Sequence, residues 1–247
     1  MKKKLKDNGF IFLKINPELE EEINNLQRKL KKLEKNLLTV NDEVFFSKII
    51  LFQKNLNKKF KPIKFMKYYS EILKKIFNNN YFGVQSYFYL RAVKPNSKSK
   101  FQPINFHRES FQGPKFFKDI YNIWIPLLNC NEHNALKYYP KSNKYKLGSD
   151  FKIMERKTNV IQGSNQHKNG LLYKDRQIIF SKKKIPKKLF KKKNLILFSG
   201  ELIHGNGSNF DNRIRFSIDA RMIIKKKISK NPIQSATGKK YFNITRV

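Results

Sequence analysis

The spacing of apolar residues changes near residue 80, and this change limits the folds open to the chain. Before that point, leucine and isoleucine recur at alternating intervals of four and three residues, which places them on one face of a helix. After it, short apolar and aromatic runs alternate with polar turns, as in the strands of a β-sandwich or barrel. The pattern predicts a mainly β chain with a helical N-terminal part.

The N-terminal part is predicted to begin with a strand at Gly9–Ile15, followed by helices. Asn16 and Pro17 have the residue types of a helix cap and a first helical position. A second helical stretch covers 44–77, with a break near Pro62. The apolar stripe of the first helix spans fewer than three heptads, which favours packing on a sheet over a coiled-coil seam. The stripe consists of Leu19, Ile23, Leu26, Leu30, Leu33 and Leu37.

Further strands are predicted between residue 81 and residue 224, with 140–194 expected to be mostly loop around one or two strands. Alternate residues of a strand point to one face, so Gln85, Tyr87, Tyr89 and Arg91 are candidates for contacts with a substrate. The strand candidates are Tyr81–Ala92, Phe101–Glu109, Tyr121–Leu128, Ala135–Tyr139, Asn194–Ser199 and Arg215–Ile224. We expect one domain over 1–247, in which 1–80 support a β core of 81–247.

The chain carries a net charge of +36, with 54 basic and 18 acidic residues. One explanation of this excess is an AT-rich genome that encodes lysine in place of arginine. The other is a polyanionic partner such as nucleic acid, an anionic membrane or a phosphorylated substrate. Charge alone does not separate these explanations. Because Cys130 is the single cysteine, no internal disulfide is possible, and a cytoplasmic location is expected. The apolar stretch Phe10–Leu13 is too short for a signal sequence or a membrane span.

His107, Glu109 and His204 form the most informative residue pattern in the chain. On an extended segment, His107 and Glu109 point the same way and can reach one metal ion. Two imidazoles and a carboxylate are the ligands of non-haem Fe(II) oxygenases, in which open coordination positions remain for other reactants. Because the carboxylate fills the position that a halide would take, Glu109 favours hydroxylation or desaturation over halogenation. His133 and His167 lie in polar turns or loops and are predicted to be surface residues.

Arg215 follows His204 by eleven residues, and Ser217 lies two residues further on the same predicted strand. The planar guanidinium group of arginine binds a carboxylate through two hydrogen bonds, and a serine hydroxyl on the same face adds a third donor. Such a pair can hold the distal carboxylate of 2-oxoglutarate while its other end chelates iron and O2 takes the last position. The sequence therefore predicts a keto-acid site next to the iron site.

Two segments resemble phytanoyl-CoA dioxygenase-like enzymes. Trp124–Asn143 is similar to the family's tryptophan strand, "ENGAL" turn and "PGSH" motif, and Phe198–Asn209, continuing to Arg215, is similar to its second metal motif. The likeness extends over about residues 80–224. It implies a double-stranded β-helix, or jelly roll, with helices packed outside, and Fe(II), 2-oxoglutarate and O2 as reactants. By position it also implies a contact from Asn122 to 2-oxoglutarate.

The sequence departs from the family at several positions. Glu109 replaces the usual aspartate and is one methylene longer, while Lys141 and Asn143 replace the glycine and histidine of "PGSH". Asn134 replaces a turn glycine, which is tolerable because asparagine can adopt a positive φ. None of these changes removes a predicted ligand.

The leading interpretation is a 2-oxoglutarate-dependent dioxygenase that hydroxylates a small molecule, for which a sugar- or phosphate-bearing substrate is compatible with the charge. A first alternative is nucleic-acid demethylation, because Arg215 and Arg221 resemble the paired arginines of alkylation-repair dioxygenases and the net charge suits a phosphate backbone. A second alternative is a catalytically inactive jelly-roll binding protein. The oligomeric state is left open by the sequence.

Overall fold

The large sheet is the centre of the protein, whose computed structural model describes residues 1–79, 81–96, 107–109, 120–144, 153–154, 172–173, 193–225 and 242–246. Within these residues seven antiparallel strands join in the order β1-β8-β4-β10-β2-β11, with β3 also paired to β10. The strands are β1 (Phe10–Lys14), β2 (Tyr81–Gln85), β3 (Tyr89–Val93), β4 (Ile120–Leu128), β8 (Asn194–Ser199), β10 (Arg215–Lys225) and β11 (Phe242–Arg246).

The longest of these strands, β10, organises the sheet. Along one edge it pairs with β4 over most of its length. Along its other edge it pairs first with β3 and then with β2. Residues on one face of β10 therefore have neighbours from three other strands.

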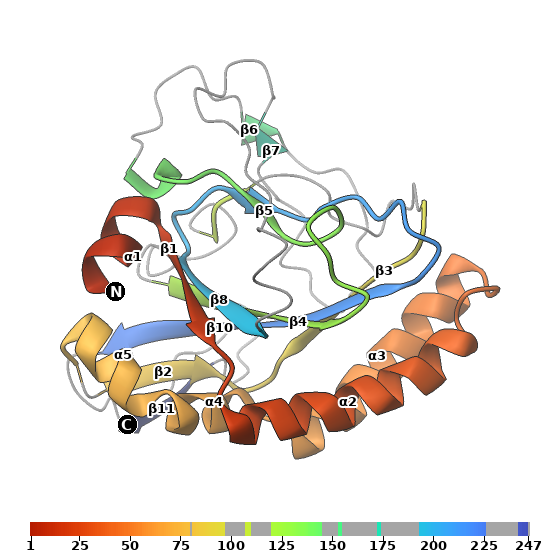
Figure 1. Ribbon diagram of the computed structural model, residues 1–247, viewed down its shortest axis with the longest axis horizontal. Coiled ribbons are helices and arrows are strands. Elements are labelled where there is room, and N and C mark those ends of the chain that lie inside the picture. The colour runs from red at the N-terminus through yellow and green to blue at the C-terminus, as the bar shows by residue number, and fades with distance from the viewer. Residues whose placement is uncertain are drawn as a thin grey trace.

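Helices cover one face of the large sheet, as Figure 1 shows for α2 and α4 below it. The side chain of Asn16 accepts a hydrogen bond from the Leu19 amide at 2.9 Å, so α2 begins as its sequence predicts. The stripe residues Leu19 and Leu30 are fully buried in one core with sheet residues, which confirms packing on a sheet. The helices are α1 (Lys2–Asn8), α2 (Pro17–Lys35), α3 (Asp42–Lys59), α4 (Pro62–Tyr68) and α5 (Ser70–Phe77).

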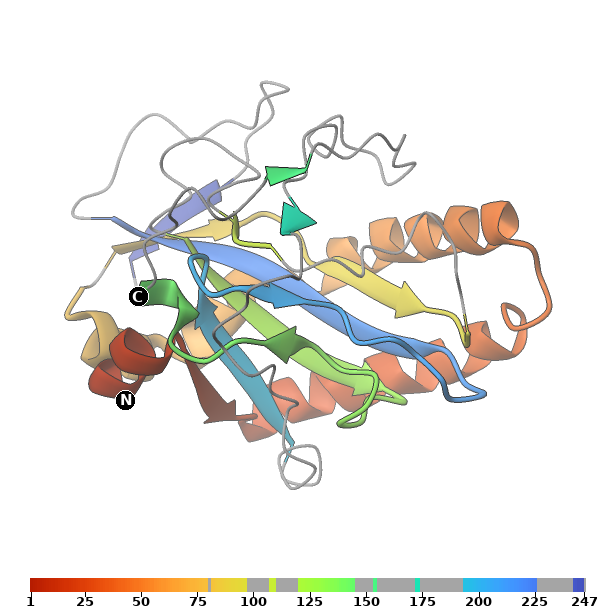
Figure 2. The ribbon, with the colours of Figure 1, turned by 90° about the horizontal axis from the view of Figure 1, so that it is seen from above.

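The opposite face of the sheet has a different composition. Trp124, Ile196 and Phe198 form a second, smaller apolar cluster there. A two-stranded sheet of β5 (Lys137–Tyr138) and β9 (His204–Gly205) lies on this side, and β6 (Ile153–Met154) pairs with β7 (Leu172–Tyr173). Figure 2 shows the large sheet from this side, with α2 and α3 beyond it. The architecture is mixed, with helices packed on an antiparallel sheet.

The local structure differs from the expectations in three places. The predicted strand Tyr81–Ala92 is two strands, because a bend at 86–88 separates β2 from β3. The short helix α1 and the strand β11 were not predicted. Asn134 is absent from the described non-glycine residues with positive φ, whereas Lys141, in the place of the family's glycine, has a φ of 68°. Asn134 instead stabilises its turn through its side chain, which accepts from the Asn131 amide at 3.0 Å and donates to the Asn129 carbonyl at 2.8 Å.

Candidate metal centre

The structure brings together His107, Glu109 and His204. His107 and His204 are joined by a two-way backbone bridge, with N–O distances of 2.9 and 3.0 Å. The amide of Glu109 donates to the carbonyl of Gly200, at 2.8 Å, in the turn that precedes β9. These backbone contacts place one ligand atom from each of the three side chains within 4.8 Å of the others. The predicted strand that carries His107 and Glu109 falls mostly outside the described residues.

The ring of His204 is oriented for coordination through Nε2. Its Nδ1 lies 2.8 Å from the carbonyl oxygen of Leu202, and a carbonyl only accepts, so Nδ1 carries the proton. The lone pair of the neutral ring is then on Nε2, which lies 3.6 Å from Oε1 of Glu109. An edge contact with Phe198, at 4.7 Å between ring centroids, further restrains the imidazole. This tautomer is the one that a metal ligand needs.

Glu109 is a buried carboxylate whose charge is stabilised by an arginine. Nε and Nη2 of Arg221 both lie 2.8 Å from its Oε2, while Oε1 faces the two imidazoles. Burial acts to raise the pKa of Glu109, but the charge of Arg221 outweighs it and holds that pKa well below its usual range. The carboxylate is therefore ionised and available to a cation at neutral pH.

Arg215 is a fully buried guanidinium group on the same side of β10. Its Nη1 donates to the hydroxyl of Ser217 at 2.6 Å, and its Nη2 lies 3.4 Å from Oδ1 of Asn206, two residues beyond His204. Its Nε has no hydrogen-bond partner among the described residues. Burial lowers the pKa of Arg215, which reflects the cost of a cation that is incompletely compensated. A carboxylate ligand fits such a group, because it would satisfy both the charge and the remaining donors.

Asn122 lies further along the sheet than its predicted role suggests. It is buried on β4, directly opposite Arg221, and its Nδ2 has no hydrogen-bond partner among the described residues. Since Arg221 contacts Glu109, Asn122 lies at the Glu109 end of β10 and six residues from the level of Arg215. Its donor is suited to an oxygen ligand near the candidate metal site.

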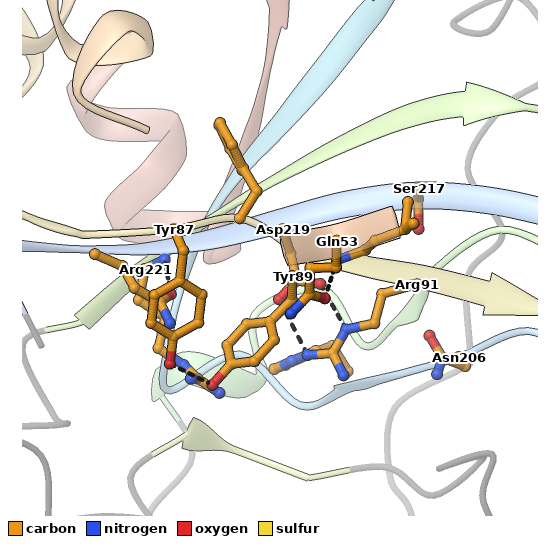
Figure 3. A network of polar contacts seen from close by, with 12 residues as sticks. Gln53, Tyr87, Tyr89, Arg91, Asn206, Ser217, Asp219 and Arg221 are labelled. Atoms are coloured by element: carbon orange, nitrogen blue, oxygen red, sulfur yellow. Dashed lines mark hydrogen bonds and ion pairs between the residues drawn. The ribbon is translucent and has the colours of Figure 1, made fainter. Parts of the chain in front are cut away.

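The predicted substrate residues form a polar network on the same face (Figure 3). The hydroxyls of Tyr87 and Tyr89 are 3.0 Å apart, and Arg91 lies over the Tyr89 ring at 5.0 Å while pairing with Asp219 at 2.6 Å. Gln85 differs because it is fully buried and accepts a hydrogen bond from the amide of Arg221 at 3.0 Å. Tyr87, Tyr89 and Arg91 are half-buried, so they are the members of this set that a ligand can reach.

The sequence alone assigned Asp219 no role at this site, and it assigned Arg221 a role only as a paired arginine in the nucleic-acid alternative. The signal was the alternation of polar residues along one strand, since Arg215, Ser217, Asp219 and Arg221 are spaced by two. The contact between Glu109 and Arg221 spans 112 residues, which no local pattern reveals. In the glycine-rich run after His204, Gly207 packs on the neighbouring turn, where a Cβ would lie 2.4 Å from the Ala135 carbonyl oxygen. His133 is exposed as predicted, and His167 lies outside the described residues.

Comparison with solved structures shows which fold the chain shares. The epimerase SnoN, in complex with Fe3+, alpha ketoglutarate and nogalamycin RO, matches with a TM-score of 0.55 at 11% identity, over 91% of this chain and 82% of that one. EvdO2 from Micromonospora carbonacea var. aurantiaca, complexed with 2-oxoglutarate, matches with a TM-score of 0.53 at 12% identity, over 94% of this chain and 93% of that one. The non-heme monooxygenase ThoJ matches with a TM-score of 0.53 at 10% identity, over 99% of this chain and 83% of that one. At these identities the likeness shows the fold.

No family model matches the sequence, and no curated protein matches it. Among the described helices, none is both long enough and apolar enough to cross a membrane.

Proposed function

We propose that the chain is an Fe(II)- and 2-oxoglutarate-dependent dioxygenase that hydroxylates a small molecule. We further propose that it is a single double-stranded β-helix domain related to phytanoyl-CoA dioxygenase-like enzymes. The observation that carries the proposal is the convergence of His107, Glu109 and His204, whose ligand atoms lie within 4.8 Å of one another. Two imidazoles and one carboxylate suit Fe(II) and leave positions for other ligands. The solved structures with the same fold include proteins that bind iron or 2-oxoglutarate.

Arg215 supplies the argument for a keto-acid co-substrate. Its charge is buried and its Nε has no hydrogen-bond partner within the described part of the chain, so an anion would fit it, and Ser217 adds a hydroxyl beside it. In the proposed complex Arg215 binds the distal carboxylate of 2-oxoglutarate, and the other end of the molecule points toward the three ligands. The group that supplies the chemistry is Fe(II), which promotes oxidation of a substrate C–H bond by O2 with conversion of 2-oxoglutarate to succinate and CO2. One oxygen atom of O2 then resides in succinate and the other in the hydroxylated product.

The protein's own contribution to this reaction is positioning and exclusion of water. The buried cluster of Trp124, Ile196 and Phe198 lines the sheet beside His204 and keeps solvent away from that ligand. Tyr87, Tyr89 and Arg91 offer hydroxyl and guanidinium donors to a polar substrate. They form the substrate-contacting surface in this proposal, and they favour hydroxylated or anionic groups.

Succinate formation tests the proposal directly. Purified protein with Fe(II), 2-oxoglutarate and O2 is expected to release succinate, and anaerobic mixing is expected to give a visible charge-transfer band. His107→Ala should lose both signals, whereas His133→Ala, a change of an exposed histidine, should keep both. A protein that binds no Fe(II), or a band that persists in His107→Ala, would contradict the proposal.

The substrate class requires a separate screen. Succinate release above the uncoupled rate should be measured with sugars, nucleotide-sugars, acyl-CoAs and amino acids, and products should be analysed for the gain of one oxygen atom. Because SnoN is an epimerase, products of unchanged mass should also be analysed for inverted stereochemistry. The nucleic-acid alternative predicts demethylation of a methylated oligonucleotide and binding that weakens steeply with salt. The inactive alternative predicts neither succinate nor product with any substrate.

A further inference from the structure

Arg221 contacts the proposed metal ligand Glu109, although it is not itself a ligand in the metal site described above. Its Nε and Nη2 both lie 2.8 Å from the same carboxylate oxygen, Oε2. Both side chains are buried, with 8% of Arg221 and 5% of Glu109 exposed. A contact of this kind is strong and directional, because the charges are shielded from water and the guanidinium is rigid.

The contact with Arg221 gives the two carboxylate oxygens of Glu109 different partners. Oε2 is engaged by Arg221, whereas Oε1 lies 3.9 Å from Nε2 of His107 and 3.6 Å from Nε2 of His204. A free carboxylate can bind a metal ion through both oxygens and so occupy two coordination positions. Glu109 is also one methylene longer than an aspartate and has one more rotatable bond. A restraint on Oε2 therefore decides how this side chain meets a metal.

Arg221 is itself held by its surroundings. Its amide donates to Oε1 of the buried Gln85 at 3.0 Å, which fixes the backbone from β2. Its guanidinium lies 5.7 Å from the centre of the Tyr89 ring, on which Arg91 also packs at 5.0 Å. Asp219 pairs with Arg91 at 2.6 Å and so counters the charge of that second guanidinium group. Figure 3 shows Arg221 beside Tyr87 and Tyr89 in this network.

We propose that Arg221 is a positioning residue that clamps Oε2 of Glu109, so that Glu109 offers one oxygen to a metal ion and leaves a second coordination position open. This inference rests on the metal site of the proposed function, but it does not depend on 2-oxoglutarate or on turnover. With one atom each from Glu109, His107 and His204, three of six octahedral positions remain for reactants. Without the clamp, the longer glutamate can bind through both oxygens or rotate away from the histidines.

Co(II) affinity tests the clamp without any activity measurement. Trp124, the only tryptophan of the chain, lies in the cluster beside His204, so quenching of its fluorescence reports Co(II) binding. We expect Arg221→Gln to weaken Co(II) binding by roughly 10- to 100-fold, as for other residues that orient metal ligands. The absorption spectrum of bound Co(II), which depends on coordination number, should also change.

Arg213→Gln is the matched control. Arg213 makes a two-point contact with the buried Glu34, whose other hydrogen-bond partners are Asn129 and Ile214 and not the proposed metal ligands. It should lower thermal stability in the same way as Arg221→Gln while leaving the affinity for Co(II) and its spectrum unchanged. If both variants lose affinity equally, Arg221 acts through general stability and the proposal is overturned.

A double-mutant cycle shows whether Arg221 acts through Glu109. In Glu109→Asp the carboxylate is one methylene shorter and withdraws from Arg221. Adding Arg221→Gln to that variant should then cause little further loss of affinity, whereas independent action would give additive losses. Wild-type affinity in Arg221→Gln, or additivity in the cycle, would overturn the clamp. If the wild-type protein binds Co(II) but does not convert 2-oxoglutarate, the proposed function fails while these measurements still decide the clamp. An absence of Co(II) binding in the wild-type protein would overturn both.

Discussion

Two buried glutamates, Glu34 and Glu109, are each paired with an arginine from the segment 213–221, and their surroundings differ in one respect. Glu34, in the last turn of α2, accepts hydrogen bonds from both Nε and Nη2 of Arg213, from the amide of Ile214 and from the side chain of Asn129. Glu109 meets Arg221 with Oε2 and presents Oε1 to two imidazoles.

The difference shows how the same pair of residue types can hold a fold together or prepare a site. At Glu34 the donors are numerous and include a backbone amide, so the carboxylate joins the end of α2 to the start of β10. At Glu109 the second oxygen, Oε1, faces the imidazoles of His107 and His204, which can coordinate a metal ion when they are neutral. A carboxylate with its acceptors fully used is a structural contact, and one that keeps an oxygen toward other ligand atoms is suited to bind a metal ion.

The largest effect on stability is expected at Glu34. Glu34→Gln removes a buried charge and leaves the Ile214 amide and the half-exposed Arg213 without their anionic acceptor, which should cost about 3 kcal/mol of unfolding free energy, mainly from the buried donors. Urea denaturation measures this loss. The affinity of the folded variant for Co(II) should equal that of the wild-type protein. A weaker affinity would contradict the assignment of a purely structural role to Glu34.

Glu109→Gln should separate binding from folding. In the wild-type protein, a divalent metal ion at 100 times its dissociation constant should raise the unfolding free energy by about 2.7 kcal/mol. The variant should show no such gain at the same metal concentration, because an amide is a poorer ligand than a carboxylate. Thermal melts with and without Co(II) provide the measurement, with Glu34→Gln as the variant that should keep the metal-dependent shift.

Tyr69 provides a reference for a buried polar group that lacks an ionic partner. Its hydroxyl donates to the Lys14 carbonyl at 2.7 Å and accepts from the Asn16 amide at 3.2 Å, so Tyr69→Phe should cost about 1 kcal/mol. Burial raises the pKa of Tyr69 from 10.0 to about 12.

The pH dependence of this change follows from that direction. A raised pKa means that the folded state favours the neutral phenol, so this contribution is fully present below pH 10 and is lost as the pH approaches 12. The difference in unfolding free energy between the wild-type protein and Tyr69→Phe should therefore shrink over this range. Tyr138, whose pKa burial also raises to about 12, is present in both proteins and does not affect the difference. A constant difference would show that Tyr69 does not titrate with unfolding.

The smallest effect concerns Lys141, in the turn that follows β5. Its φ of 68° is a left-handed conformation that glycine adopts without strain, so Lys141→Gly should raise the unfolding free energy by less than about 1 kcal/mol. The adjacent carbonyl of Ser142 accepts a hydrogen bond from Arg108, which lies between two of the proposed metal ligands in the sequence. Co(II) affinity should be unchanged if the strain is local, and a change in affinity would extend the metal-binding unit to this turn.

Local periodicity predicted much of this architecture. The cap at Asn16, the apolar stripe of α2 and the strands β8 and β10 follow from residue spacing alone. Helix α1 was not predicted because its seven residues include one buried side chain, Leu5, which is too few to show a period. The break between β2 and β3 was missed because Tyr87 keeps the alternation of its neighbours through the bend.

The parts of the site that lie two residues apart on one strand could be predicted from the sequence. The parts that depend on contacts between distant residues could not. His107 with Glu109, and Arg215 with Ser217, are pairs two residues apart whose members were expected to act together. The structure places both pairs on one side of the large sheet. The contact of Arg221 with Glu109, and the orientation of His204 by the Leu202 carbonyl, depend on the packed fold and could not be predicted from local sequence.

The alternation along β10 makes this strand intolerant of a change in length. Arg215, Ser217, Asp219 and Arg221 face the candidate site, while Phe216, Ile218, Ala220 and Met222 are buried in the core under the helices. Inserting or deleting one residue before Arg215 would exchange the two sets, since a shift of one residue turns every side chain to the opposite face. The four polar side chains would then be buried in the apolar core, and the candidate site would lose them. Among natural variants of this chain, insertions should therefore collect in the segments that connect β10 to its neighbours, and the length of the strand itself should stay constant.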